Sequence, residues 1–251
     1  MKADVQLAVS DDLERHTRVE LAACYRLMPH IGVEDLTYNH ISARVPGEDA
    51  LLVKPSGMMV REVTASSLWK YSLDGAPLGG TVRRAPNAIT VIHGNILKLR
   101  PDLHCVIHTH TPANVAVSAQ ECGLLPLSQH ALMFYGRLAV HEFGGYEFDL
   151  AMRDPLARDL GDKSVALLRN HGVLVAAPTI GAAFVKHHFY EMACRIQVGA
   201  LAGGQKLVVP PPEVCERAVK QVHEVEGTSS GDKDWPALLR LADELYSGYR
   251  D

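Results

Sequence analysis

The stretch Cys105-Val106-Ile107-His108-Thr109-His110 is the part of this chain from which its fold and chemistry are best predicted. Its apolar first half is typical of a buried strand, which we place over residues 103–110. Alternate residues of a strand point to the same face, so the imidazoles of His108 and His110 should converge on one side. Such a pair is a suitable seat for Zn²⁺, Mn²⁺ or Fe²⁺. Taken alone, the pattern also fits two surface histidines on an edge strand.

A second histidine motif, Asn170-His171-Gly172, follows the apolar run 165–168. A histidine at the mouth of a strand, followed by a glycine that permits a tight backbone, is well placed to supply a third metal ligand. Three neutral imidazoles leave coordination positions open. An open position is what distinguishes a catalytic metal site from a structural one.

Around these motifs the sequence alternates irregularly between helical and extended patterns. Ser10 is expected to cap a first helix that runs to about Met28. Further helices are expected at 64–68, 87–98, 112–122, 180–201 and 235–249, and extended segments at 39–45, 50–54, 137–142, 164–168 and 173–177. The polar segment 226–234 is expected to be a loop. The mixture predicts an α/β fold in which helices flank a central sheet.

Composition limits the class of protein. The 251 residues carry 25 Lys and Arg against 29 Asp and Glu, a net charge of −4, and form one domain by length. The lack of a long basic run predicts no nucleic-acid partner. No apolar stretch approaches the roughly 20 residues of a membrane-spanning helix. The five cysteines form no Cys-x-x-Cys pair and the N-terminus has no signal-like core, which predicts a cytoplasmic protein with reduced thiols.

In combination, several segments resemble the class II aldolase/adducin family. They are 39–44 (Asn-His-Ile-Ser-Ala-Arg), 54–57 (Lys-Pro-Ser-Gly), 89–93 leading to Arg-Pro-Asp at 100–102, 106–112, and 168–173. The likeness covers residues 13–204, which leaves a C-terminal loop and helix over 205–251. It implies a three-layer α/β/α sandwich around a mixed, mostly antiparallel sheet. It also implies that His108, His110 and His171 hold one divalent metal ion, in a homotetramer whose sites lie at subunit boundaries.

The chain departs from the sugar-phosphate aldolases of that family at residues that matter for their chemistry. Their catalytic glutamate falls on Ile89, which can neither bind a metal nor move a proton. Their two phosphate-binding serines fall on Asn87 and Ala88. The candidate substrate-binding residues are Thr37, Ser42, Ser56, Gly57 and Asn87. A carboxylate is therefore expected in place of a phosphate, because hydroxyl and backbone N–H groups also bind carboxylates.

These departures favour decarboxylation. Loss of CO₂ removes no proton from the substrate, so the missing glutamate matters less than it does for aldol chemistry. A proton must still be returned to the carbon, and the candidate donors are His40 and His130. The position of His130 resembles that of a tyrosine that aldolases contribute across the subunit boundary. His93, which lies among apolar residues, is expected to be a hydrogen-bonded structural histidine.

The sequence thus predicts a divalent-metal-dependent carbon–carbon lyase, with zinc, manganese or iron as its metal. The favoured reaction is decarboxylation of a hydroxylated carboxylic acid, including aromatic ones. The nearest alternative is aldol cleavage of a non-phosphorylated hydroxy-oxo acid. An iron-dependent oxygenase and a non-enzymatic, adducin-like binding module remain open. The expected partner is a small carboxylate or carbonyl compound, and neither nucleic acid nor a membrane.

Overall fold

The centre of the fold is an eight-stranded sheet, seen in a computed structural model that describes residues 2–81, 83–146, 149–226, 231 and 233–251. The strand order is β4-β3-β2-β1-β5-β8-β7-β6. Every neighbouring pair is antiparallel except β6 and β7, which run parallel. The strands are β1 (His40–Arg44), β2 (Ala50–Val53), β3 (Trp69–Ser72), β4 (Pro77–Leu78), β5 (Cys105–Thr109), β6 (Leu138–His141), β7 (Val165–Leu168) and β8 (Gly172–Ala177).

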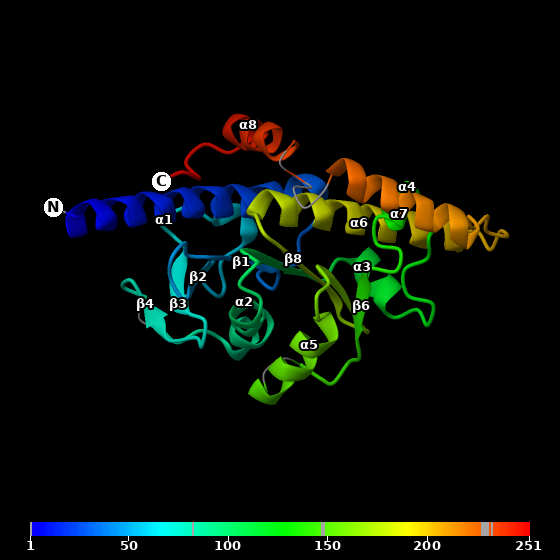
Figure 1. Cartoon of the computed structure of the whole chain (residues 1–251), viewed down its shortest axis with the longest axis horizontal. Coiled ribbons are helices and arrows are strands. Elements are labelled where there is room, and N and C mark those ends of the chain that lie inside the picture. Colours follow the sequence, from blue (N-terminus) through cyan, green and yellow to red (C-terminus); the bar gives the residue numbers. More distant parts are fainter. Residues whose placement is uncertain (1, 82, 147–148, 227–230, 232) are drawn as a thin grey trace.

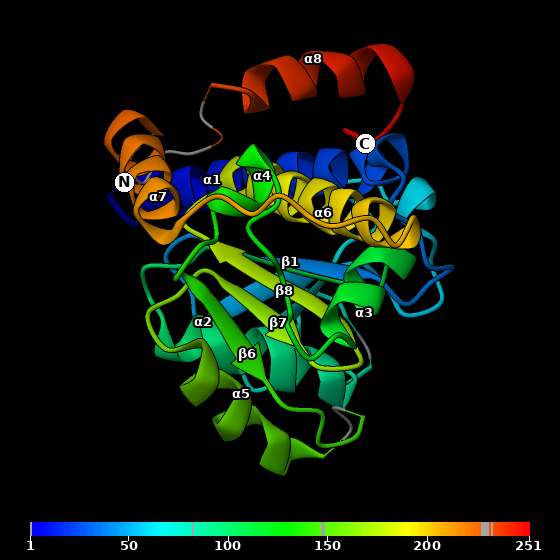
Figure 2. The same ribbon diagram turned by 90° about the vertical axis from the view of Figure 1, so that its right-hand side faces the viewer.

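Helices cover both faces of the sheet. One face carries α1 (Lys2–Leu27) and α6 (Ile180–Ala202), and α8 (Trp235–Leu245) packs outside them against both (Figures 1 and 2). The other face carries a π-helix, η3 (Ile89–Gly94), which continues into α2 (Asn95–Leu99), and also α5 (Arg153–Leu160). The remaining helices are α3 (Pro112–Ser118), α4 (Gln129–Leu132) and α7 (Pro212–Glu226), with short 3₁₀ turns at Pro29–Ile31, Val60–Glu62 and Leu150–Met152. The expected three-layer α/β/α sandwich with a mixed, mostly antiparallel sheet is confirmed.

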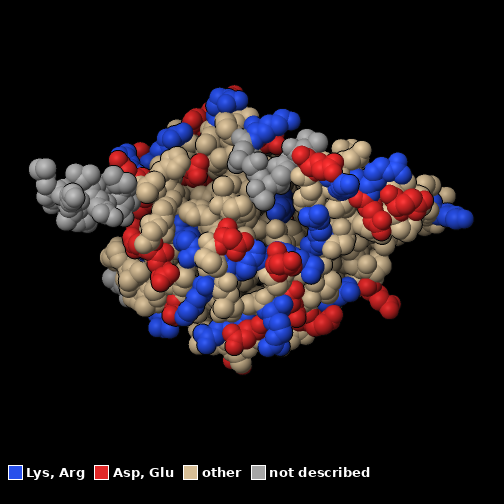
Figure 3. Space-filling view, in the orientation of Figure 1, with Lys and Arg blue, Asp and Glu red and all other residues tan. Residues whose placement is uncertain are grey.

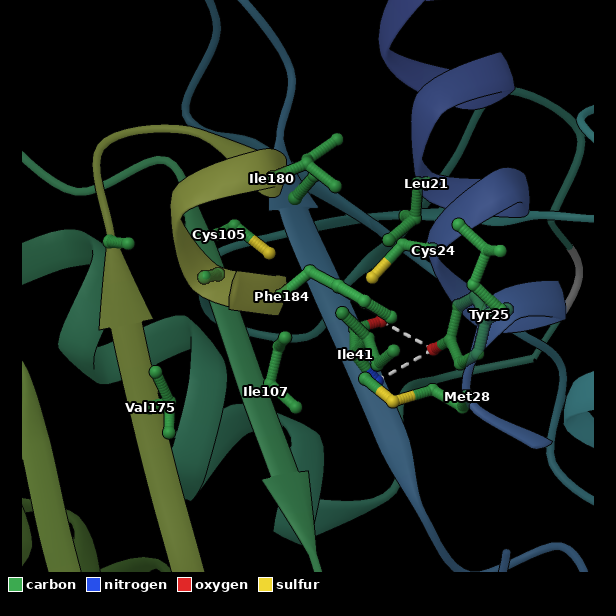
Figure 4. Close-up of a cluster of buried hydrophobic side chains, with 14 of the residues drawn as sticks. Leu21, Cys24, Tyr25, Met28, Ile41, Cys105, Ile107, Val175, Ile180 and Phe184 are labelled. Atoms are coloured by element: carbon green, nitrogen blue, oxygen red, sulfur yellow. Dashed lines mark hydrogen bonds between the residues drawn. The ribbon is translucent and has the colours of Figure 1, made fainter. Parts of the chain in front are cut away.

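The central pair of strands, β5 and β8, is fully buried. Every residue of β5 and β8 is buried, which explains why both read as continuous apolar runs rather than as alternating ones. Figure 4 shows side chains from α1 and α6 packed over the face of β1, β5 and β8. Tyr25 is fully buried there, and its hydroxyl donates to the carbonyl of Ile41. The same hydroxyl accepts from the backbone N–H of Ile41 at 2.8 Å and of Lys54 at 3.3 Å. One side chain therefore joins α1 to β1 and to the residue after β2.

Several elements differ from the sequence prediction. The first helix begins at Lys2 rather than at Ser10. A serine caps the N-terminus of a helix only where the residues before it are not helical, and here they are. Strands β3 and β4 and helices α5 and α7 were not predicted. In α5 the proline at position 155 stands in the first turn, where a missing N–H costs little. Of the predicted loop 226–234, residues 227–230 and 232 lie outside the described residues.

The surface carries no strong separation of charge on the face that Figure 3 presents, where Lys and Arg side chains lie among Asp and Glu side chains. Within the described ranges, no helix is both long and apolar enough to cross a membrane.

Candidate metal centre

Three histidines from three places in the chain meet at one end of the central strands. His108 lies in β5, His110 follows the end of β5, and His171 lies in the turn between β7 and β8. The Nε2 atom of His108 lies 2.9 Å from that of His110 and 3.2 Å from that of His171. The three potential ligand atoms all lie within 4.8 Å of one another. The structure thus brings together the three residues that the sequence singles out as metal ligands.

The turn that carries His171 depends on unusual backbone geometry. Asn170 has a φ of +54° and Gly172 a φ of +151°. A Cβ atom on Gly172 would lie 2.3 Å from the carbonyl oxygen of Thr109, so only glycine lets β8 approach β5 this closely. The tight backbone that the sequence predicts at the glycine after His171 is present.

The hydrogen bonds of the imidazoles show that the cluster suits a cation. The Nδ1 of His108 lies 2.9 Å from the carbonyl oxygen of Val173, to which it can only donate. The Nδ1 of His110 lies 3.1 Å from a carboxylate oxygen of Asp35 and donates to it in the same way. In the neutral rings both Nε2 atoms then carry lone pairs, and these face each other across 2.9 Å. Two lone pairs at that distance repel, and a metal ion between them removes the repulsion.

Burial keeps His108 in its ligating form. The His108 side chain is buried, and its pKa is held well below the usual value by burial and by the neighbouring imidazoles. Metal ligation requires neutral imidazole, so the environment of His108 favours the protonation state that binds a metal.

A cavity of about 620 Å³ opens beside the three imidazoles. Thr37, His40, Ser56 and Gly57, all expected to bind substrate or move a proton, line it. The remaining lining residues are Asp35, Tyr38, Val53, Lys54, Tyr71, Pro86, Ala88, Ile89, Ile92, His108, His110, Phe143, Tyr146, Asn170 and His171.

Among the described residues that line this cavity, Lys54 carries the one ammonium group. Its side chain is 6% exposed, and its Nζ donates to the carbonyl oxygen of Thr37 at 2.7 Å. Burial lowers the pKa of Lys54 to about 8. Arg44, at the end of β1, donates to the carbonyls of Leu97 and Leu103 and is not among the residues that line the cavity.

Behind His40 lies a short chain of hydrogen bonds. The Nδ1 of His40 is 2.7 Å from the Nε2 of His93, whose Nδ1 is 2.7 Å from the hydroxyl of Ser42. His93 is fully buried, which lowers its pKa to about 3 and keeps it neutral. His93 therefore orients His40, whose ring centroid lies 5.1 Å from that of His108. His93 is thus buried and hydrogen-bonded at both ring nitrogens, as the sequence predicts.

Three other predicted site residues lie elsewhere in the subunit. Ser42 is fully buried and faces His93 instead of the cavity. Asn87 is exposed between two residues that line the cavity but is not part of the lining. His130 lies on α4, with its ring 5.5 Å from that of Phe189, and is also absent from the lining. It could serve a metal centre only across a subunit boundary.

Ile89 occupies the cavity wall at the position of the missing glutamate. It is 6% exposed and begins the π-helix η3, a rare geometry that is often found at functional sites. Within the described lining, Asp35 is the only carboxylate, and its contact with His110 engages it. The cavity therefore offers a metal seat and a cation, with apolar surface where a base would stand.

Sequence reasoning missed Asp35, Lys54 and Phe143 as parts of the cavity. Asp35 lies 75 positions before His110, and no local pattern links the two residues. Lys54 belongs to a motif noted for the resemblance, Lys-Pro-Ser-Gly, which is the signal that could have directed attention to it.

Comparison with known proteins now decides the family. The family profile for the class II aldolase and adducin N-terminal domain matches residues 19–198. The chain belongs to the class II aldolase and adducin family. A Pseudomonas aeruginosa protein named "Putative aldolase class 2 protein PA3430" is 40% identical over 253 residues, covering 100% of this chain and 97% of that protein. Alpha-adducin of Rattus norvegicus is 38% identical over 255 residues, covering 96% of this chain but 34% of the adducin.

Solved structures of this family share the fold. An aldolase II superfamily protein from Pseudomonas syringae is 40% identical, with a TM-score of 0.89 over 95% of this chain and 96% of that one. L-fuculose 1-phosphate aldolase from Glaciozyma antarctica has a TM-score of 0.81 at 23% identity, covering 94% of each chain. Class II aldolases are often metal-dependent lyases, whereas adducins show that the same domain occurs in proteins of another kind.

Proposed function

We propose that this protein is a divalent-metal-dependent carbon–carbon lyase that decarboxylates hydroxylated carboxylic acids, aromatic ones included. The observation that carries the proposal is the composition of the cavity. Three converging imidazoles and one ammonium group line it, while the only carboxylate among the described lining residues, Asp35, is engaged by His110. Such a site can bind an acid and return a proton, but it has no carboxylate available to remove one.

The metal would be held by His108, His110 and His171, with Asp35 fixing the ring of His110. Zinc, manganese and iron all accept imidazole ligands, so each fits this donor set. When bound, the cation would supply Lewis acidity, stabilising negative charge on a substrate oxygen next to the bond that breaks.

The cavity lining has a polar part and an apolar part, which would bind different groups of a substrate. Lys54 attracts a carboxylate, and its location beside Ser56 and Gly57 gives that group further hydrogen-bond donors. The apolar part of the lining consists of aliphatic and aromatic side chains, among them Val53, Ile92 and Phe143. A flat, weakly hydrated body is therefore a better fit than a sugar phosphate.

Lys54 is also the group that we assign to return the proton. With a pKa of about 8, it is mostly protonated at pH 7 and gives up its proton more readily than an ordinary lysine. The carbon–carbon bond to the carboxyl group breaks, CO₂ leaves, and the electron pair stays on carbon. The Lys54 ammonium proton then forms the new C–H bond, and water restores the ammonium group. His40, held by His93, hydrogen-bonds the substrate, and His130 would contribute from a neighbouring subunit if the protein is a homotetramer.

A binding module without activity is the second candidate, because alpha-adducin is 38% identical over nearly the whole chain. The two differ in what the histidines do. A lyase needs all three as ligands, whereas a binding module gains nothing from lone pairs forced to within 2.9 Å of each other.

The test combines metal analysis with product analysis. The purified protein is loaded with Zn²⁺, Mn²⁺ or Fe²⁺ and incubated with a carboxyl-¹³C-labelled hydroxybenzoic acid that has a hydroxyl beside the carboxyl-bearing carbon, or with a 4-hydroxy-2-oxo acid. We expect labelled CO₂ and near-stoichiometric metal, both lost in His110→Ala. Paired carbonyl fragments instead of CO₂ would favour the aldolase, and a requirement for O₂ an oxygenase. A chain that binds no metal would overturn the lyase and favour the binding module.

A further inference from the structure

A second cavity, of about 660 Å³, lies at the opposite end of the same central strands. Its lining includes Leu103 before β5, Val165 at the start of β7 and Pro178 after β8. Leu103 and His108 are five positions apart on one extended segment, which separates this cavity from the imidazoles by roughly 17 Å. The segment after α4 and the helices α6 and α7 complete the walls, with Met133, Phe134, Lys186, Val222 and His223.

The lining of this cavity is cationic although the whole chain is acidic. It contains four Lys or Arg side chains and two Asp side chains, an excess of two positive charges in a chain of net charge −4. Arg100 is neutralised by Asp102, with Nε–Oδ1 and Nη2–Oδ2 distances of 2.8 and 2.6 Å. Asp162 is exposed and contributes the second negative charge.

The other three cations are without a counter-ion. Across the part of the chain that the structure describes, the side chains of Arg137, Lys163 and Lys186 make neither an ion pair nor a hydrogen bond. Lys186 is the most enclosed of the three, since it rises from the buried face of α6 between Val185 and His187. Burial without an opposite charge lowers the pKa of Lys186.

The remainder of the cavity is apolar. Leu103, Met133, Phe134, Val165 and Val222 form much of its wall, so an occupant would meet both hydrophobic surface and a group of cations. A cavity of this volume accommodates a small organic molecule. Three unpaired cations in its lining suit a group with more than one negative charge, because each can donate a charge-assisted hydrogen bond.

We propose that this cavity is a binding site for a small organic phosphate, whose phosphoryl group is held by Arg137, Lys163 and Lys186 and whose apolar part rests against Phe134 and Val165. The site is independent of the metal centre, because it shares no lining residue with the metal-centre cavity. It stands whether or not the protein is a lyase.

The experiment titrates the chelator-treated, full-length chain with phenyl phosphate and with inorganic phosphate by isothermal calorimetry. We expect phenyl phosphate to bind more tightly than inorganic phosphate, since only the former contacts the apolar wall. Lys186→Met and Lys163→Met should each weaken binding by at least about tenfold, which corresponds to the loss of one charge-assisted hydrogen bond.

Two control variants locate the binding. Lys206→Met removes the same charge from an exposed position outside both cavities and should change affinity by less than about twofold. Lys54→Met removes the cation of the metal-centre cavity and should also leave affinity unchanged. Affinity lost in Lys54→Met but retained in Lys186→Met would overturn the proposal, as would the absence of binding at millimolar concentration. The proposal would also be overturned if the parent protein bound neither phosphate compound while Lys186→Met changed the sedimentation coefficient. That result would favour a contact between subunits at this cavity.

Discussion

The two ends of the strands β5, β7 and β8 hold their polar groups in different ways. At the histidine end, the ring of His108 is fixed by the carbonyl of Val173 and that of His110 by Asp35, so both rings are oriented by partners within the chain. At the other end, the side chains of Lys163 and Lys186 have no ion-pair or hydrogen-bond partner among the described residues. One end of the sheet is built around groups that are already oriented, and the other around charges that lack counter-ions.

This difference bears on what each cavity can do. Chemistry requires groups held in place by their own partners, because a small misplacement of a reacting group costs rate. Recognition of an anion requires mainly that charges be available, since long lysine side chains adapt to what they bind. The histidine end is therefore suited to catalysis and the cationic end to binding, and variants at each end should show different sensitivities.

The largest effect is expected from Gly172→Ala. An alanine there would need a strained φ of +151° and a Cβ 2.3 Å from the Thr109 carbonyl, so the turn carrying His171 must move. We expect a loss of about 3 kcal/mol in the free energy of unfolding and a large loss of metal affinity, measured by denaturation and by metal titration.

Gly199→Ala is the matched control for this variant, because a Cβ at that helical position meets nothing within 4 Å and alanine favours helices. Phenyl phosphate affinity should survive in folded Gly172→Ala protein. Unchanged metal affinity in Gly172→Ala would contradict the view that the histidine end depends on fixed geometry.

An intermediate effect is expected from Asp35→Asn. The substitution keeps the size of the side chain but weakens the hydrogen bond that orients His110, so metal affinity should fall by about 10- to 100-fold with little change in stability. Metal titration followed by spectroscopy of bound Co²⁺ would measure it. Glu34→Gln removes the neighbouring carboxylate, which pairs with Arg61 instead, and should leave metal affinity unchanged. Equal losses in both variants would show that only overall charge matters.

The smallest effect concerns Lys54. Its folded pKa of about 8 lies below that of the unfolded chain, so the unfolded state binds more protons above pH 8 and the charged ammonium costs stability below it. Lys54→Met should therefore stabilise the metal-free protein by about 1 kcal/mol below pH 8. The gain should shrink as the pH rises toward the ordinary lysine value, as urea unfolding at several pH values would show. Lys186→Met should give a smaller gain, since that side chain is more exposed. A gain independent of pH would mean that packing, not charge, is responsible.

The sequence predicted the contacts between residues that are close together in the chain, and missed those between distant residues. The convergence of His108 and His110 follows from the two-residue period of a strand, and the tight turn after His171 follows from glycine at 172. Asp35 reaches His110 only because the segment before β1 folds back over the end of β5, which no local pattern encodes. Lys54 is buried, and its Nζ donates to the carbonyl of Thr37 in the segment before β1, a contact that the Lys-Pro-Ser-Gly motif alone does not reveal.

The same limit applies to the fold. The buried central strands and the long helix α6 were predicted because their apolar runs are long. Strand β3 was missed because only Tyr71 in it is buried, so its pattern does not stand out. The roles of Ser42 and His130 came from the resemblance, and the structure places Ser42 behind His93 and His130 on α4. The family motifs thus predicted which region forms the site better than they predicted the contacts of each residue in it.

The hydroxyl of Tyr25 has a consequence for the dynamics of the metal-centre cavity. It binds the backbone of Ile41, next to His40, and the N–H of Lys54, so both residues are tied to the buried helix α1. The amide hydrogens of Ile41 and Lys54 should exchange with solvent only in large-scale opening events, like those of core strands. The wall that carries His40 and Lys54 is then rigid on the timescale of turnover.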